Sequence, residues 1–425
     1  MVTFGIVIIL IAALSGAPIF AVLLASAMLG FWAVDIPLAI VAVEVYRIVD
    51  TPLLVVLPLF TYSGYLLAAA KTSERLVDVA QSLFGWLPSG LALVGFVVCA
   101  IFTALTGASG VTIVALGALL LPALVRTGYT EKFGLGLVTT SGSLGLLLVP
   151  SVPLILYGIL VQQMEIGEPF TIVQLFLAGI LPMLLMLLLL IAYTLYVHRG
   201  GIIPRVEFSS TRMWSAIKSA RWELPLPLVI LGGIYSGYFA VSEAAAVTAV
   251  YVTIVEVLIY KEVPWRRLPN VMIEAMVMVG GILLVLGVAL AFANFLVDVE
   301  VPQKLFLFAQ EHIHSKIEFL LLLNVILLVL GAFLDIFSAL VVVVPLILPV
   351  AIGYGVHPVH LGIIFLANMQ IGYFTPPVGM NLFVASYRFR KPIQELYLAS
   401  WPFMCVLLVA LILITYVPWI SLVFL

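Results

Sequence analysis

The sequence predicts an all-α polytopic membrane protein, and its composition is the first reason. Of the 425 residues, 64% are hydrophobic and only 9% are charged, and the mean hydropathy is +1.30. Soluble domains carry about 25% charged residues, so this chain could not cover a surface that faces water. Its apolar runs are long and continuous, whereas a β-barrel needs alternating ones. Internal breaks in these runs, and their recurrence along the chain, narrow the fold further.

The N-terminal part is expected to form scaffold helices. The first basic residue is Arg47, so the start of the chain lacks the positive region of a cleaved signal peptide, and a membrane segment is expected from Met1 onward. Residues 71–85 carry apolar side chains at helical spacing, with polar ones such as Arg75 and Asp78 opposite them. This pattern predicts an amphipathic helix that lies in the membrane interface.

Next comes a pair of short apolar arms around a polar turn, Thr106 to Gly110. The arms, Leu91–Leu105 and Val111–Val125, are each too short to cross a bilayer alone, because a spanning helix needs about 20 residues. The pattern predicts a re-entrant hairpin, and the alternative is a pair of kinked helices joined by an external turn. The following segment, 133–162, is broken at 148–153, where proline removes a backbone donor.

The middle of the chain is expected to connect two membrane halves. Residues 199–223 are the most polar stretch and predict a second interfacial helix on the cytoplasmic side. Further on, Ser242 is expected to cap a helix with Glu243 in its first turn, where a negative charge suits the helix dipole. A functional role for the Glu243 carboxylate is the alternative. The basic residues of the connector are Arg199, Arg205, Arg212, Lys218 and Arg221.

From about residue 271 the pattern of the first half recurs. A short arm (Phe319–Leu330), a break (Gly331–Asp335), a second arm to about Ile352 and a last broken helix (370–381) follow one another. A constant offset of 227 residues, as between positions 122 and 349, aligns glycine and proline four times. The aligned pairs are Pro122 with Pro349, Gly128 with Gly355, Gly145 with Gly372, and Pro150 with Pro377.

The two halves are predicted to have opposite orientations in the membrane. The loop that contains Arg126 and Lys132 is basic, while its partner, residues 354–360, has no Lys or Arg. By the positive-inside rule the first loop is cytoplasmic and the second lies on the other side. The sequence therefore predicts an inverted structural repeat with two re-entrant hairpins and two broken helices.

Such a repeat is an architecture of secondary transporters, whose sites lie near the bilayer midplane at the breaks. Unwound carbonyls and hydroxyls offer hard oxygen ligands to a cation such as Na⁺, and half-helix N-termini offer amide donors to an anionic substrate. Asp335 is an ionisable residue within an apolar segment, which indicates a functional group. A helix N-cap at the hairpin turn is the equally open alternative for this residue.

Five stretches carry a family resemblance. They are TGASGVTIVALGALLLPAL (from Thr106), GSLGLLLVPSVPLILYG (from Gly142), GGIYSGYFAVSEAAAV (from Gly232), GAFLDIFSALVVVVPLILP (from Gly331) and IGYFTPPVGMNLFVAS (from Ile371). In this order, over nearly the whole chain, they resemble the large membrane subunit of tripartite ATP-independent periplasmic (TRAP) transporters. Each motif alone is a moderately specific signal for this family, and the occurrence of all five in this order is a strong one.

The resemblance implies an elevator-type, sodium-driven importer in a bacterial inner membrane. In this family, a periplasmic binding protein delivers an organic acid anion such as a C4-dicarboxylate or sialic acid. A small four-helix membrane subunit and the surrounding membrane lipid support the large subunit. An ion gradient as energy source agrees with the lack of a phosphate-binding loop in the sequence. Neither an enzymatic activity nor a nucleic-acid partner is expected.

Motif by motif, the resemblance implies two sodium sites and a substrate site. The first sodium site would use Thr106 and Ser109 at the hairpin tip with backbone oxygens around the first break, and the second would use the matching parts of the second half. The residues of the first site are Thr106, Ser109, Gly145, Leu148 and Pro150. Those of the second site are Gly331, Gly372, Thr375 and Val378. The candidate substrate residues are Ser143, Ser151, Asp335, Pro377 and Asn381.

Several positions depart from the family's usual residues. The first tip usually reads Ser-Gly-Ser-Ser, so one hydroxyl is lost here at Ala108. The family's paired proline is Val149-Pro150 here, and its Thr-Pro before the later Thr-Glu is Ala240-Val241. Asp335 is followed by the bulky pair Ile336-Phe337. These differences bear on the ligands of the first site and on the shape of the pocket.

The expected organisation has six parts, and other functions are kept as alternatives. The runner-up is a standalone sodium/anion permease of related elevator fold that needs no binding protein, and a passive channel or an intramembrane enzyme would be different classes. The parts are first-repeat scaffold helices (1–70), the first transport half (71–165), a central scaffold with its connector (166–270), a second scaffold and interfacial helix (271–316), the second transport half (317–390) and a C-terminal scaffold helix (391–425).

Overall fold

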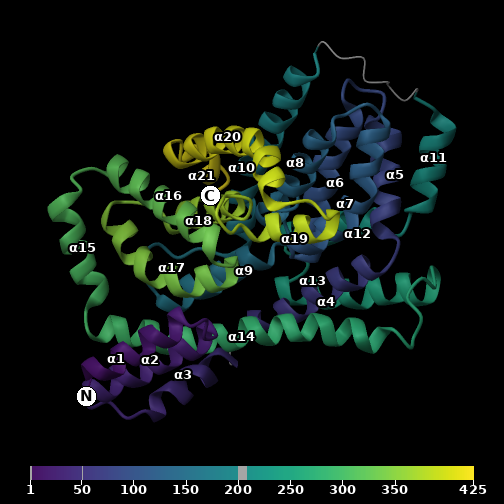
Figure 1. Ribbon diagram of the computed structural model, residues 1–425. Coiled ribbons are helices and arrows are strands. Elements are labelled where there is room, and N and C mark those ends of the chain that lie inside the picture. The colour runs from purple at the N-terminus through teal and green to yellow at the C-terminus, as the bar shows by residue number, and fades with distance from the viewer. Residues whose placement is uncertain (1, 50, 200–207) are drawn as a thin grey trace.

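The computed structural model describes residues 2–49, 51–199 and 208–425 (Figure 1). Within these ranges every regular element is a helix. Eight of the described helices are long and apolar enough to cross a membrane, or nine if the bent pair Leu53–Ala69 and Thr72–Phe84 counts as one span. Large apolar side chains such as Phe4 and Val277 are about 70% exposed, as expected of a surface that faces lipid. The predicted class, a polytopic helical membrane protein, is confirmed.

The longest helix, α14, runs along one side of the molecule, and other helices pack against it near both ends (Figure 1). It packs against α2 and α3 near one end and against α4 towards the other, where α4 also packs on α13. The elements of this part are α1 (Val2–Leu14), α2 (Ile19–Ala33), α3 (Ala39–Val49), the 3₁₀ turn η1 (Pro52–Val55), α4 (Val56–Ala69), α13 (Val241–Thr253), the π-helical turn η3 (Ile254–Ile259) and α14 (Leu268–Asp298).

The first predicted hairpin consists of two helices that are joined only by Gly107 and Ala108. Gly107 has φ +68, a conformation that glycine adopts without steric cost. The broken segment after it contains a helix, a 3₁₀ turn and a second helix, so the predicted break is confirmed. The elements are α6 (Gly90–Thr106), α7 (Ser109–Arg126), α8 (Glu131–Ser141), η2 (Leu144–Leu147) and α9 (Val152–Met164).

The second half contains a similar succession of helices, without a 3₁₀ turn between the last two. Ser109 and Arg126, the ends of α7, each lie 227 residues before Ile336 and Gly353, the ends of α17, and the same spacing separates Ser143 from its hydrogen-bond partner Gln370. The peptide bonds before both aligned break prolines are cis. The elements are α16 (Lys316–Phe333), α17 (Ile336–Gly353), α18 (Pro358–Gly372) and α19 (Met380–Phe389).

The core of the molecule lies where the two broken segments meet. Every residue of α18 is buried, and so is nearly all of the stretch from α8 to α9. The Ser143 hydroxyl donates to the Gln370 carbonyl oxygen at 3.1 Å and links the two breaks. The remaining elements are α5 (Thr72–Phe84), α10 (Ile172–Val197), α11 (Ser210–Ser219), α12 (Pro225–Tyr235), α15 (Val301–His312), α20 (Ile393–Tyr416) and α21 (Trp419–Leu422).

Two expectations about helix ends were wrong. Gly331 was expected in the second hairpin's turn, but it lies in the last turn of α16, which ends at Phe333. The N-cap before Glu243 is Ala240 rather than Ser242, and the Glu243 carboxylate accepts a hydrogen bond from the Ala240 amide at 2.9 Å. The capping role of Glu243 is therefore confirmed.

Arg75 was expected on the exposed polar face of its helix and is instead buried. The helix itself exists as α5, bent by 76° from the preceding helical stretch, Leu53–Ala69. The polar connector contains α11, while Arg205 lies outside the described residues.

Candidate functional site

A cleft of about 590 Å³ lies between the tips of the two hairpins. Its walls come from the start of α7, the start of α17, the first break at Leu146 and the second break at Tyr373. Helices α4 and α14 close the other side with Tyr65 and Met278. The tertiary structure therefore brings both hairpin tips and both breaks, which are far apart in sequence, to one cavity.

The first tip is held by close backbone contacts. A Cβ added at Gly64 of α4 would lie 2.4 Å from the Cα of Thr106, so only glycine permits this approach. On the other side, Gly107 packs against Val152 at the start of α9. Thr106 and Ser109 are buried, and Ser109 lines the cleft. The tip is thus fixed between α4 and the first broken segment.

Helix α7 starts at this tip without a side-chain cap. Its N-cap residue is Ala108, which has no acceptor atom in its side chain. The amide groups at the start of a helix have no partner within the helix, and here Ser109, Gly110 and Val111 all line the cleft. This end of the cleft therefore offers backbone donors and the positive end of a helix dipole.

The other predicted residues of the first sodium site lie at the break beside the tip. A Cβ added at Gly145 would lie 2.1 Å from the Ala100 carbonyl oxygen, so the 3₁₀ turn packs directly on α6. Leu148 has an extended backbone (φ −100, ψ 140), and Pro150 follows in the unwound stretch before α9. The backbone at Leu148 and Pro150 is not helical, as cation coordination by carbonyl oxygens requires.

The predicted substrate residues Ser143 and Ser151 do not line the cleft. Both are buried and engaged in the fold. Ser143 donates to Gln370, as described above, and Ser151 donates to the Leu146 carbonyl oxygen at 2.5 Å while it caps α9 through the Leu154 amide. Their hydroxyls stabilise the unwound backbone.

The second tip contacts its own break through a pair of glycines. A Cβ added at Gly372 would lie 2.6 Å from the backbone of Gly331, and the Gly379 amide donates to the Ala332 carbonyl oxygen at 2.9 Å. The Thr375 hydroxyl donates to the Ile371 carbonyl oxygen at 2.8 Å, and Val378 lies in the partly exposed unwound stretch. The structure thus brings the tip and the break of the second predicted sodium site into contact.

Asp335 both caps α17 and faces the cleft. One carboxylate oxygen, Oδ1, accepts hydrogen bonds from the amides of Phe337 and Ser338 at 3.0 Å each, and Oδ2 accepts from the Ser338 hydroxyl. The Tyr373 hydroxyl accepts from the Ile336 amide at 2.8 Å. The N-cap interpretation is confirmed, and the carboxylate also contributes to the cleft wall.

The last two predicted substrate residues do not line the cleft. The Pro377 carbonyl oxygen accepts a hydrogen bond from the Tyr397 hydroxyl of α20. Asn381 is fully buried and donates to the Thr139 carbonyl oxygen at 3.1 Å, which joins α19 to α8. Of the five candidates for substrate contact, only Asp335 lines the cleft.

Sequence reasoning missed the apolar walls of the cleft. Tyr65, Met278, Leu146 and Val384 line it, yet each lies in an apolar stretch with nothing to distinguish it from a core residue. Only the packing of α4, α14 and α19 against the tips selects them. Phe337, noted in the sequence for its bulk, also lines the cleft and narrows the space beside Asp335.

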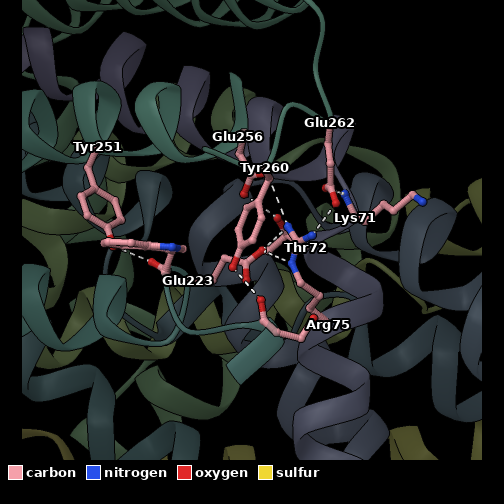
Figure 2. A network of polar contacts seen from close by, with 10 residues as sticks. Lys71, Thr72, Arg75, Glu223, Tyr251, Glu256, Tyr260 and Glu262 are labelled. Carbon is pink, nitrogen blue, oxygen red and sulfur yellow. Dashed lines mark hydrogen bonds and ion pairs between the residues drawn. The ribbon is translucent and has the colours of Figure 1, made fainter. Parts of the chain in front are cut away.

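A second polar feature, also missed, is a buried charge cluster at the start of α5 (Figure 2). The Arg75 guanidinium contacts three carboxylates and stacks at 4.0 Å over the Tyr260 ring. Its Nε lies 2.6 Å from Glu223 and its Nη1 lies 2.5 Å from Glu262, while Nη2 contacts Glu223 and, at 3.4 Å, Glu256. Burial raises the pKa of Glu223 above its usual value, and Arg75 offsets part of that shift.

The fold and the cleft define a helical membrane protein whose two hairpin tips meet at a solute-sized cavity. The chain matches the family described as "Tripartite ATP-independent periplasmic transporter, DctM component" over residues 4–420. It therefore belongs to this family, which is a family of transporter permeases and not of enzymes.

Curated relatives match most of this chain. The C4-dicarboxylate TRAP transporter large permease protein DctM of Rhodobacter capsulatus is 35% identical, covering 92% of this chain and 91% of the relative. The isethionate TRAP transporter permease protein DctMQ of Oleidesulfovibrio alaskensis is 34% identical, over 90% of this chain and 60% of the relative. The sialic acid TRAP transporter permease protein SiaT of Haemophilus influenzae is 30% identical, over 88% of this chain and 60% of the relative.

A solved structure shares the fold at low sequence identity. The YdaH transporter of Alcanivorax borkumensis, described as having an unusual topology, aligns with a TM-score of 0.61 and 16% identity over 87% of this chain and 85% of that chain. At this identity the likeness concerns the fold alone.

Proposed function

We propose that this chain is the large membrane subunit of a sodium-coupled importer of an organic acid anion. The observation that carries the proposal is the cleft between the two hairpin tips, with an uncapped helix N-terminus at one end. Relatives named for C4-dicarboxylate, isethionate and sialic acid transport support an acidic solute as the substrate. The substrate anion would bind at the start of α7, where amide donors and the helix dipole favour negative charge.

An inverted repeat underlies the site. The matching ends of α7 and α17 support the repeat, and so do two glycine contacts at the same spacing. Gly145 packs on Ala104 of the first hairpin, and Gly372 packs on Gly331 of the second. Opposite orientation of the halves follows from the positive-inside rule, because the loop after α7 is basic and the loop after α17 has no Lys or Arg.

The coupling ion is Na⁺, held by oxygen atoms where each tip meets its break. The first site would combine the hydroxyls of Thr106 and Ser109 with carbonyl oxygens near Leu148. The second would combine the Thr375 hydroxyl with carbonyl oxygens near Gly372. Hard oxygen ligands suit Na⁺, and an ion bound between tip and break would hold each hairpin closed against its broken helix.

Transport proceeds by an elevator motion of the hairpins and broken helices against the remaining scaffold. Helices α4 and α14 supply the scaffold wall of the cleft, through Tyr65 and Met278. The tight glycine contacts support movement of each hairpin and its break as one body, because close-packed elements shift as rigid units.

The protein works in the bacterial inner membrane with two partners. A separate small four-helix membrane subunit would cover part of the apolar scaffold surface, and a periplasmic binding protein would deliver the substrate. The family's description as tripartite and periplasmic supports this assembly. A standalone sodium/anion permease of related fold is the alternative.

Uptake by proteoliposomes tests the proposal. When the proposed small subunit and binding protein are included, a labelled organic acid accumulates only under an inward Na⁺ gradient. Thr375→Ala raises the Na⁺ concentration needed for half-maximal uptake, because one ligand is lost from the second site. Uptake that is independent of Na⁺ contradicts the coupling, and uptake without the binding protein favours the standalone permease.

A further inference from the structure

The charge cluster around Arg75 joins three segments at the elbow between α4 and α5 (Figure 2). Arg75 comes from α5, Glu223 from the turn before α12, and Glu256 from the π-helical turn η3. Glu262 follows in the loop after η3. One guanidinium therefore faces three carboxylates, which cannot all be balanced by it.

The charges of two of the three carboxylates are accounted for, one by a counter-charge and the other by access to water. Glu223 takes the closest contacts, through Nε and Nη2 of Arg75, so these two groups balance each other. Glu262 lies at the rim with its side chain 19% exposed, and its second oxygen accepts from the Lys71 amide at 2.7 Å. Solvent screens the charge of a group in this position.

Glu256 is the surplus carboxylate. Its side chain is 0% exposed, its contact with Arg75 is the longest of the three at 3.4 Å, and its other oxygen accepts only from the Thr72 hydroxyl at 3.1 Å. A buried carboxylate without a full counter-charge is costly, and such a group takes up a proton instead. The geometry thus favours a neutral Glu256.

A second, independent feature also indicates that a proton is bound at this cluster. Oxygen Oε2 of Glu223 is buried and has no hydrogen-bond partner, although the Glu223 side chain is only 3% exposed. Glu223 and Glu256 contact the same nitrogen of Arg75, Nη2, so their carboxyl groups are neighbours. A proton between them would satisfy the lone oxygen and remove the surplus charge.

The two tyrosine hydroxyls beside the pair are engaged elsewhere. The Tyr251 hydroxyl donates to the Trp222 carbonyl oxygen and the Tyr260 hydroxyl to the Ser219 carbonyl oxygen, each at 2.6 Å. Among the described residues no group of three or more His, Cys, Asp or Glu is placed to hold a metal ion. The charged and titratable groups that face the pair or flank it are Lys71, Arg75, Tyr251, Tyr260, Lys261 and Glu262.

We propose that Glu223 and Glu256 bind one proton between them, forming a proton site that keeps α5 anchored to η3 and to the turn before α12. Two neighbouring carboxyl groups that share a proton titrate as a pair. Loss of the proton would leave a second buried negative charge beside Arg75 and weaken the anchor. The site lies outside the cleft and holds whether or not sodium drives uptake.

Infrared spectroscopy of the purified protein in lipid nanodiscs tests the site directly. At neutral pH the wild type shows the carbonyl stretch of a protonated buried carboxyl group, and Glu256→Gln removes that band. Glu74→Gln is the matched control, because Glu74 lies on the same helix, α5, but is exposed. It leaves the band unchanged. A wild type without the band at neutral pH, or a band that persists in Glu256→Gln, overturns the proposal.

Thermal unfolding supplies a second readout. The folded protein keeps the shared proton over a pH range in which the unfolded chain has already lost it. The wild-type midpoint is therefore highest at low pH, falls as the pH rises through that range and levels off once the folded protein has also lost the proton. Glu256→Gln copies the neutral form, keeps the wild-type midpoint at low pH and removes this fall. Glu223→Gln lowers the midpoint at neutral pH, because Arg75 loses its closest partner. A Glu256→Gln protein that unfolds as early as Glu223→Gln, or that fails to fold, shows that Glu256 is ionised and contradicts the proposal.

Discussion

The two hairpin tips occupy matching positions in the chain but differ in their chemistry. At the first tip the N-cap is Ala108, which leaves the amides at the start of α7 without a side-chain acceptor. At the second tip the N-cap is Asp335, whose carboxylate takes the amides of Phe337 and Ser338. The same spacing of 227 residues that relates Ser143 to Gln370 relates these two caps. Two tips at matching positions in the chain thus present different groups to the same cleft.

This difference would give the proposed substrate anion one preferred orientation in the cleft. An anion is attracted to the uncapped N-terminus of α7 and repelled by the Asp335 carboxylate. None of the residues that line the cleft is Lys or Arg, so the α7 amides are its main source of positive potential. The tips also share a feature, which is a glycine contact with the neighbouring break. We expect substitutions at this shared contact to reduce uptake more than substitutions at the two caps.

The largest effect is expected from Gly372→Ala. The new Cβ would lie 2.6 Å from the Gly331 backbone and would separate the second tip from its break. Overpacking of this kind costs about 1–3 kcal/mol, and we expect uptake to be abolished and the thermal midpoint to fall. Gly280→Ala is the control, because a Cβ there meets nothing within 4 Å. Normal uptake by Gly372→Ala would show that the close contact is dispensable.

Ala108→Asp would make the first tip resemble the second. The new carboxylate would cap α7, which stabilises a helix by about 1 kcal/mol, but it would also occupy the amides that attract the anion. Two like charges about 4 Å apart repel by about 4 kcal/mol at an effective dielectric constant of 20. We therefore expect at least a hundredfold loss of substrate affinity with no loss of stability, measured by uptake kinetics and thermal unfolding. Ala108→Ser, which caps without charge, is the matched control and should bind more tightly than Ala108→Asp.

Asp335→Asn separates capping from charge at the second tip. Asparagine caps helices about as well as aspartate, so the thermal midpoint should stay near that of the wild type, whereas Asp335→Ala should lose about 1 kcal/mol of stability. If the carboxylate orients the substrate, uptake falls in both variants. Uptake that falls only in Asp335→Ala would mean that the residue acts purely as a cap.

The smallest effect is expected far from both tips. Glu243 caps α13 through the Ala240 amide and contacts no part of the cleft. Glu243→Gln preserves the capping geometry and should leave uptake and stability unchanged, while Glu243→Ala should cost about 0.5–1 kcal/mol of stability. A large loss of uptake in Glu243→Gln at normal stability would restore the functional interpretation of this carboxylate.

Much of the fold could be predicted from local patterns. The turns at Gly107 and near Asp335 and the break before Pro150 all fell within a few residues of their predicted places, because glycine, proline and polar residues interrupt apolar runs wherever the helix ends. The break at Gly331 was placed too early, since a glycine near the end of a helix is compatible with both the last turn and the loop.

The site was less predictable. Residue type marked Asp335 and Ser109, which line the cleft, but it also marked Ser143, Ser151 and Asn381, whose polar groups stabilise the core instead. Both uses of a polar side chain at membrane depth look alike in sequence, because a buried polar group must find a partner whether that partner is backbone or ligand.

The sequence by itself determined that this is a helical membrane protein and where most of its hairpin turns and helix breaks lie, because composition and helix termination are local properties. Only the tertiary structure decided which surfaces meet. It placed Tyr65 and Met278 on the cleft wall, turned Arg75 inward to three glutamates and placed Ala108 and Asp335 in the walls of one cavity. The segments that meet here lie up to 227 residues apart in the chain (335 − 108 = 227), and no local pattern of residues encodes their meeting.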